Sequence, residues 1–88
     1  MDERQKVVAD KIAGYLSETL RLPRENIDYD IPLFGDGIGL DSVDSLEIIA
    51  GMDMLFGVSL MGVNDGVLRN IRTLSEYIIG HPDYKENQ

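Results

Sequence analysis

The residue with the clearest chemical use is Ser42, which the sequence places at the start of a predicted helix. Asp41 precedes it as a favoured N-cap residue, and Asp44 follows three residues later, so Ser42 falls in the first helical turn. The dipole of a helix favours negative charge at this end, and the first-turn N–H groups have no partner within the helix. A phosphate ester on the Ser42 hydroxyl would therefore lie in a favourable field.

A serine at a helix start also has a plain structural use, because its hydroxyl can satisfy a backbone donor. For an isolated Asp-Ser pair this structural interpretation is favoured. Hydrolytic catalysis by Ser42 with the single histidine, His81, is disfavoured because no Gly-x-Ser-x-Gly turn surrounds the serine. The sequence therefore predicts neither a catalytic residue nor a dedicated metal site.

Acidic residues are concentrated around Ser42. The chain carries a net charge of −8, and residues 25–68 hold nine acidic residues and no basic one. Nucleic acid is an unsuitable partner, since a phosphate backbone requires lysine and arginine. A basic protein surface is the natural complement, although a solvated acidic face that only aids solubility explains the charge equally well.

Length and composition predict one small domain spanning residues 1–88. Cysteine is absent, so neither disulfides nor thiolate metal sites hold the fold. The N-terminus is polar and no apolar stretch is long enough to cross a bilayer, which leads us to expect a monomeric cytoplasmic protein.

Apolar periodicity predicts a first helix over residues 3–22, which Pro23 would end. Residues 23–41 have no helical period, and a loop this long must be held by its own apolar residues. We expect Leu33 and Phe34 to be pinned inside the protein.

A second helix is predicted over residues 42–56, with Gly57 as a left-handed cap. Gly51 in its middle can allow a close approach by another backbone or by a partner. A short helix through residues 64–71, a final helix opened by a Thr73–Glu76 capping box and a frayed tail over residues 83–88 complete the chain. With no alternating strand pattern, this order predicts an all-α four-helix bundle with three longer helices and one short one.

The run from Gly39 to Glu47 resembles the prosthetic-group attachment motif of acyl carrier proteins. In that family an Asp-Ser-Leu sequence, or a close variant, opens the second helix, and here it reads Asp41-Ser42-Val43. Leu46-Glu47 follows at the family spacing, and Phe56-Gly57-Val58 occurs at the matching distance downstream. The resemblance extends from about residue 27 to residue 79 and agrees with the chain length.

This resemblance implies a non-catalytic carrier with 4′-phosphopantetheine attached to Ser42 through a phosphodiester. The thiol of that arm would hold an acyl group as a thioester, for partner enzymes of fatty acid, polyketide or related biosynthesis. The alternatives are a peptidyl or aminoacyl carrier, and an acidic helical interaction module that never uses the arm. Neither the cargo nor the pathway is encoded in the sequence.

In the family, the second helix is the main docking surface for partner enzymes. The implied partners are a phosphopantetheinyl transferase and acyl-loading, ketosynthase-type or acyltransferase-type enzymes with basic docking surfaces. Gly51 and Met54 stand where acidic residues are common in fatty-acid carriers, so docking here is expected to rely more on apolar contact. The candidate recognition residues are Asp41, Asp44, Leu46, Glu47, Ala50, Asp53 and Met54.

A sheltered acyl chain would enter between the helices. The candidate lining residues are Ile49, Met52, Phe56, Met61 and Ile71. Each of them is better explained as ordinary core, although methionine is adaptable enough for either role.

Overall fold

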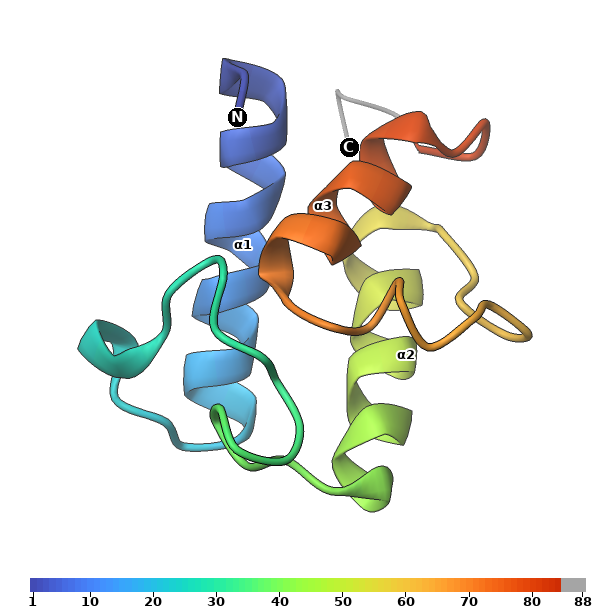
Figure 1. Cartoon of the computed structure of the whole chain (residues 1–88). Helices are drawn as coiled ribbons and strands as arrows, with labels where there is room; N and C mark the ends of the chain where they lie inside the picture. Colours follow the sequence, from blue (N-terminus) through green and yellow to red (C-terminus); the bar gives the residue numbers. More distant parts are fainter. Residues whose placement is uncertain (85–88) are drawn as a thin grey trace.

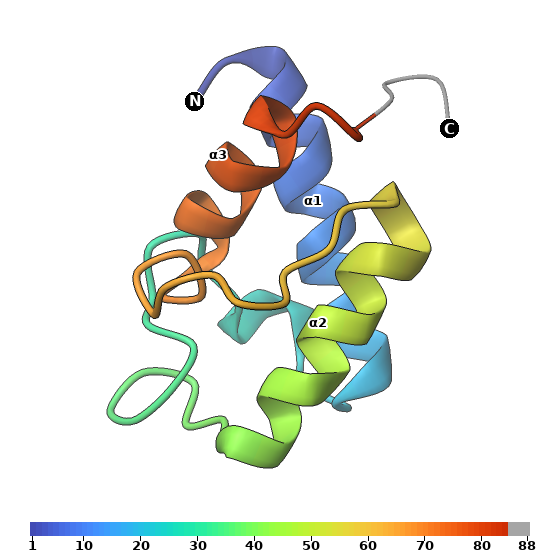
Figure 2. The same cartoon turned by 90° about the vertical axis from the view of Figure 1, so that its right-hand side faces the viewer.

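Three α-helices and one short 3-10 turn surround a shared apolar core in the computed structural model, which describes residues 1–84 (Figure 1). The helices are α1 (Glu3–Thr19), α2 (Ser42–Phe56) and α3 (Ile71–Gly80), and the turn is η1 (Arg24–Asn26). α1 and α2 run in opposite directions, and α3 packs mainly against α1 (Figures 1 and 2). The all-α prediction is confirmed.

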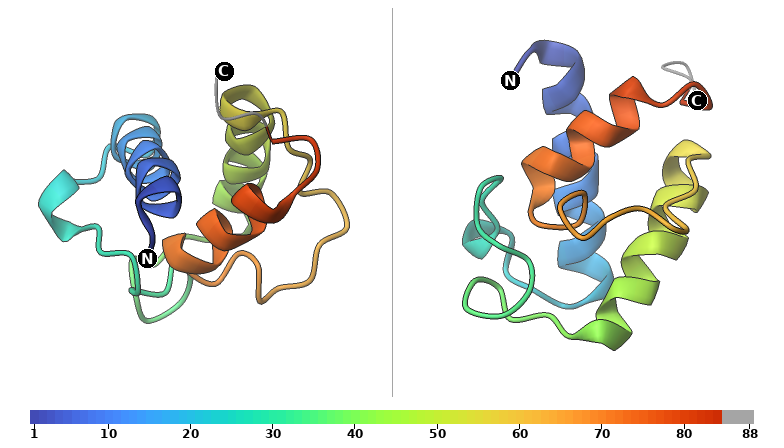
Figure 3. Two further views of the ribbon diagram at one scale, coloured as in Figure 1. Left: turned by 90° about the horizontal axis from the view of Figure 1, so that it is seen from above. Right: turned by 45° about the vertical axis from the view of Figure 1, so that its right-hand side comes forward.

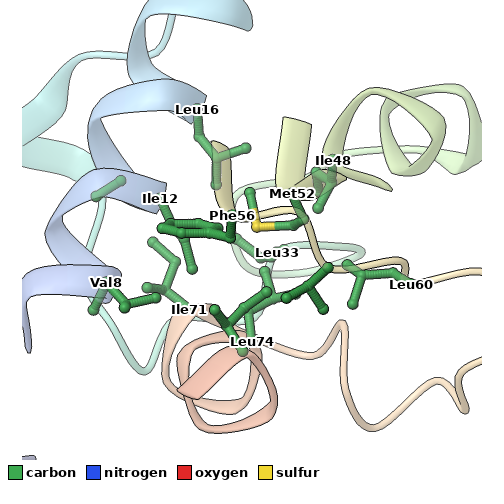
Figure 4. Close-up of a cluster of buried hydrophobic side chains, with 14 of the residues drawn as sticks. Val8, Ile12, Leu16, Leu33, Ile48, Met52, Phe56, Leu60, Ile71 and Leu74 are labelled. Carbon is green, nitrogen blue, oxygen red and sulfur yellow. The ribbon is translucent and has the colours of Figure 1, made fainter. Parts of the chain in front are cut away.

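The core lies where the three helices face one another. Viewed from above in Figure 3, α1, α2 and α3 enclose it from three sides, and Figure 4 shows side chains from all three helices meeting there. The helices supply buried residues at helical spacing, namely Val8, Ile12 and Leu16 from α1, Ile48, Met52 and Phe56 from α2, and Ile71, Leu74 and Ile78 from α3. Leu33, Val58 and Leu60 complete the core from the connecting segments.

α1 ends earlier than predicted. Asp2 caps its start by accepting a 2.8 Å hydrogen bond from the Gln5 N–H, but the helix ends at Thr19 rather than near residue 22. Arg21 adopts a left-handed backbone with φ 57°, and the Leu22 N–H donates to the Ser17 carbonyl at 3.0 Å. This is the hydrogen bond of a Schellman ending, so the chain leaves the helix before Pro23 can act.

The long connection between α1 and α2 is fastened at its centre by Leu33. The Leu33 side chain is 0% exposed, as predicted, while Phe34 is only half-buried against the core. The Leu33 N–H donates to the Arg69 carbonyl at 2.8 Å, and its own carbonyl accepts from the Leu40 N–H at 2.9 Å. The connection is therefore tied both to the core and to the segment that precedes α3.

Polar contacts fasten the same connection to α1 and α3. The Tyr29 hydroxyl donates to the Asp10 carboxylate, and its carbonyl accepts from the Arg72 N–H at 3.0 Å. The Arg72 guanidinium binds Asp30 through two nitrogens. Its hydrogen bonds lower the pKa of Asp30, while the hydrogen bond to Asp10 raises the pKa of Tyr29.

The segment before α3 differs from the prediction. The expected short helix over residues 64–71 is replaced by turns, in which the N–H groups of Val67 and Leu68 donate to the carbonyls three residues earlier. α3 then begins at Ile71, because Asn70 and Thr73 form the capping box, so the predicted Thr73–Glu76 box does not start the helix. Starting at Asn70 places Ile71 in the core.

Part of the predicted frayed tail is packed. The Tyr84 ring meets Phe56 edge-on, with ring centroids 6.0 Å apart, and the Tyr84 N–H donates to the His81 carbonyl at 3.1 Å. Fraying of residues 83–88 stays a prediction, and residues 85–88 lie outside the described residues.

What approaches Gly51 in the structure is a side chain from α1 rather than another backbone. The Tyr15 ring lies directly over Gly51, where an added methyl group would overlap it. The Tyr15 hydroxyl donates to the Glu47 carboxylate at 3.2 Å, and burial is the main cause that raises the pKa of Tyr15. Gly51, which lowers the local helix propensity of α2, thus leaves the space in which the Tyr15 ring of α1 packs.

The effect of Gly51→Ala on the free energy of unfolding should therefore depend on residue 15 and reverse its sign when Tyr15 is removed. With Tyr15 present, overpacking that costs about 1–3 kcal/mol outweighs a helix-propensity gain of up to about 1 kcal/mol, so the free energy of unfolding falls. In a Tyr15→Ala background the same substitution should raise it by up to about 1 kcal/mol. Urea denaturation of the four variants measures the coupling, and equal effects in both backgrounds would contradict the packing described.

Candidate functional site

Ser42 is the first residue of α2, and its side chain is exposed. The helix start is completed by its acidic neighbours. Asp41 Oδ1 accepts hydrogen bonds from the Val43 N–H at 3.0 Å and the Asp44 N–H at 3.2 Å, and Asp44 Oδ2 accepts from the Asp41 N–H at 3.0 Å. The predicted N-cap role of Asp41 is confirmed.

This capping box bears on the structural use of the serine. Because Asp41 and Asp44 already form the capping box, the Ser42 hydroxyl is not needed as a cap. The Ser42 hydroxyl makes no hydrogen bond to any residue among 1–84, and only its carbonyl is engaged, by the Ser45 hydroxyl at 2.6 Å. The oxygen is therefore free to form a covalent bond.

An open pocket of about 580 Å³ lies beside Ser42. The connection before α2 and the turns before α3 form its walls, and these two segments approach each other in Figure 2. Apolar side chains and a single base share the pocket with the start of α2; its lining residues are Pro32, Phe34, Leu40, Asp41, Ser42, Ser45, Asp65, Gly66, Leu68 and Arg69. The volume lies within the range of small-molecule sites.

One side of α2 presents apolar side chains to solvent. Val43, Leu46 and Met54 are 71%, 65% and 69% exposed, and Ala50 is exposed between them. Their spacing of three and four residues aligns them along one stripe of the helix. The acidic candidates Asp41, Glu47 and Asp53 are exposed as well, and Asp44 is half-buried. The stripe and these acids make α2 a mixed apolar and acidic surface.

The candidate residues for a sheltered acyl chain do not line the Ser42 pocket. Met52, Phe56 and Ile71 are buried in the core, and Ile49 is half-buried against it. Met61 is 74% exposed, so in this structure it does not lie between the helices. The core interpretation of the buried residues agrees with their packing.

Sequence reasoning missed several residues near Ser42. Val43 belongs to the exposed stripe, and its spacing to Leu46 was the available signal. Phe34, Leu68 and Arg69 line the pocket, but they come from irregular segments whose approach no local pattern reveals. Only the folded chain brings these groups together.

Other chemistry is not assembled around Ser42. His81 follows the end of α3, where its ring lies 5.6 Å from that of Tyr77. In Figure 1 this end of α3 and the start of α2 lie at opposite ends of the molecule. Residues 1–84 contain no cluster of three or more histidine, aspartate or glutamate side chains arranged to hold a metal ion. Within the same residues, no helix combines the length and apolar character that crossing a bilayer requires.

Comparison with known proteins gives consistent matches over most of the chain. A family model described as the phosphopantetheine attachment site matches residues 10–78. The acyl carrier protein of Cyanidium caldarium is 25% identical over 80 residues, covering 91% of this chain and 92% of that protein. The acyl carrier protein of Phytoplasma australiense is 29% identical over 73 residues, covering 83% and 91% respectively. No solved structure matches the chain significantly.

Proposed function

Because the chain belongs to the phosphopantetheine-attachment family of acyl carrier proteins, non-catalytic carriers that hold 4′-phosphopantetheine, we propose that Ser42 is its attachment residue. The observation that carries this proposal is the free, exposed hydroxyl at the start of α2. A group that many enzymes must reach needs an anchor at an open element end rather than in a deep cavity. The pocket beside Ser42 also leaves room for a bulky substituent.

The residues around Ser42 fit such an arm in different ways. When bound, the arm supplies a thiol that holds an acyl group as a thioester. Ser42 would contribute its oxygen to the phosphodiester and lose the hydroxyl proton, while the pyrophosphate bond of the coenzyme A donor breaks and adenosine 3′,5′-bisphosphate leaves. Asp41 and Asp44 hold the helix start in place, although their charges oppose that of a phosphate. Their exposed carboxylates are better suited to attract a basic partner surface.

The direct test is the intact mass of the purified chain after incubation with coenzyme A and a phosphopantetheinyl transferase. We expect the mass of one phosphopantetheine to be added to each chain. Peptide mapping should place the group within residues 42–45. A chain that stays unmodified with several unrelated transferases would contradict the proposal.

We further propose that α2 is the docking surface for the transferase and for acyl-handling enzymes of fatty acid, polyketide or related biosynthesis. The exposed apolar stripe suits an apolar groove on the partner, and the acids beside it suit a basic rim. The nine acids and missing bases of residues 25–68 extend this complement over the region around Ser42. Mass spectrometry of the protein purified from its native host would identify the acyl cargo.

Docking through the stripe predicts that Leu46→Asp raises the transferase KM. Loss of a contact worth more than about 1 kcal/mol corresponds to an increase of about fivefold or more. Val7→Asp is the matched control, because Val7 is 49% exposed on α1 and lies outside the stripe. The control should change KM by less than about twofold, because a substitution at an exposed position outside the interface has little effect. Equal effects of the two variants would count against docking by α2.

A further inference from the structure

The pocket beside Ser42 combines features that match the near half of a pantetheine arm. That half consists of a phosphate, two geminal methyl groups, a hydroxyl and an amide. The pocket offers apolar walls, including Phe34, Leu40 and Leu68, and one cation, Arg69. Ser42 itself lines the pocket, so the first atoms of the arm would start inside it.

Arg69 is available to pair with a phosphate. Its backbone is held by the hydrogen bond from Leu33, which fixes the position of the residue against the connection before α2. Its side chain is exposed and forms no ion pair or hydrogen bond with any residue among 1–84. It is also the first base after the base-free run of residues 25–68. Arg69 is therefore the expected partner for a phosphate bound near Ser42.

The helix start offers the phosphate fewer donors than usual. The N–H groups of Val43 and Asp44, two of the donors that commonly bind anions at a helix start, already donate to Asp41. Asp41 and Asp65 also line the pocket and repel a phosphate. Arg69, the single base that lines the pocket, is therefore the main source of charge neutralisation there.

We propose that the pocket seats the near half of the arm, with its phosphate paired to Arg69 and its geminal methyl groups against Leu40 and Leu68. This inference rests on attachment at Ser42. The distal half and its cargo extend from the pocket toward a partner enzyme.

The test uses the arm-bearing chain labelled with ¹³C and ¹⁵N and an unlabelled arm. Isotope-filtered NOE spectra should connect the geminal methyl protons to the Leu40 and Leu68 methyl groups. Arg69→Gln should reduce the seated population by about two- to fivefold, the range expected for an exposed ion pair. Arg21→Gln is the matched control, because Arg21 is exposed and does not line the pocket.

The outcomes separate the seat from the attachment. If the mass shows the arm but its methyl protons have no NOE to the pocket, the seat is wrong and attachment stands. If the NOEs persist at full strength in Arg69→Gln, or fall equally in Arg21→Gln, the pairing with Arg69 is wrong. A chain that never gains the arm would overturn both proposals.

Discussion

Ser42→Ala should abolish attachment of phosphopantetheine while leaving the fold unchanged. The substitution removes the only atom of residue 42 that can form the phosphodiester. It should alter the free energy of unfolding by less than about 0.5 kcal/mol, because the hydroxyl makes no hydrogen bond within residues 1–84. Intact mass after incubation with the transferase measures the first effect, and urea denaturation measures the second.

Ser45→Ala is the matched control for this experiment. Ser45 lies one helical turn after Ser42, lines the same pocket and carries the same hydroxyl, which is engaged with the Ser42 carbonyl. It should still be modified to completion. If Ser42→Ala were still modified, or if only Ser45→Ala lost the modification, Ser42 would not be the attachment residue.

Leu33→Ala should be among the most destabilising single substitutions in the chain. The side chain is fully buried, and truncating such a leucine costs about 2–5 kcal/mol through lost burial and the cavity left behind. A domain of this size has a total stability of only about 5–13 kcal/mol, so the loss is a large share of the whole. Urea denaturation at 25 °C should show a clearly lower midpoint.

Leu46→Ala provides the comparison, because it removes the same atoms from a side chain that is 65% exposed on α2. Its effect should stay within about 0.5 kcal/mol. If Leu33→Ala were equally mild, the long connection would not be held through this residue. The same measurement therefore tests how the wall of the Ser42 pocket is kept in place.

α2 could be predicted to the residue because its signals are local. Asp41 with Asp44 marks the start, and Gly57, with φ 69°, marks the end. α3 was less predictable, because Asn70–Thr73 and Thr73–Glu76 are overlapping capping patterns in the sequence. Burial of Ile71 favours the first pattern, and burial is a property of the folded chain.

The candidate site was likewise predictable where its signals are local and unpredictable where they are not. The exposure of Ser42 and of the α2 stripe follows from their place on one helix, where spacing gives direction. The pocket required the Leu33–Arg69 hydrogen bond, which joins segments that are far apart along the chain. Short-range periodicity carries no information about such a pairing, and Arg69 was missed for that reason.

The reciprocal capping of Asp41 and Asp44 has a consequence for how partners distinguish one state of the chain from another. A helix end that needs nothing from residue 42 keeps its shape whether or not that residue is substituted. Beyond residue 42 itself, the bare and the loaded protein would then offer the same α2 surface, and they would compete on equal terms for an enzyme that contacts only that surface. Selection of the loaded form must come from contacts that the enzyme makes with the arm or its cargo.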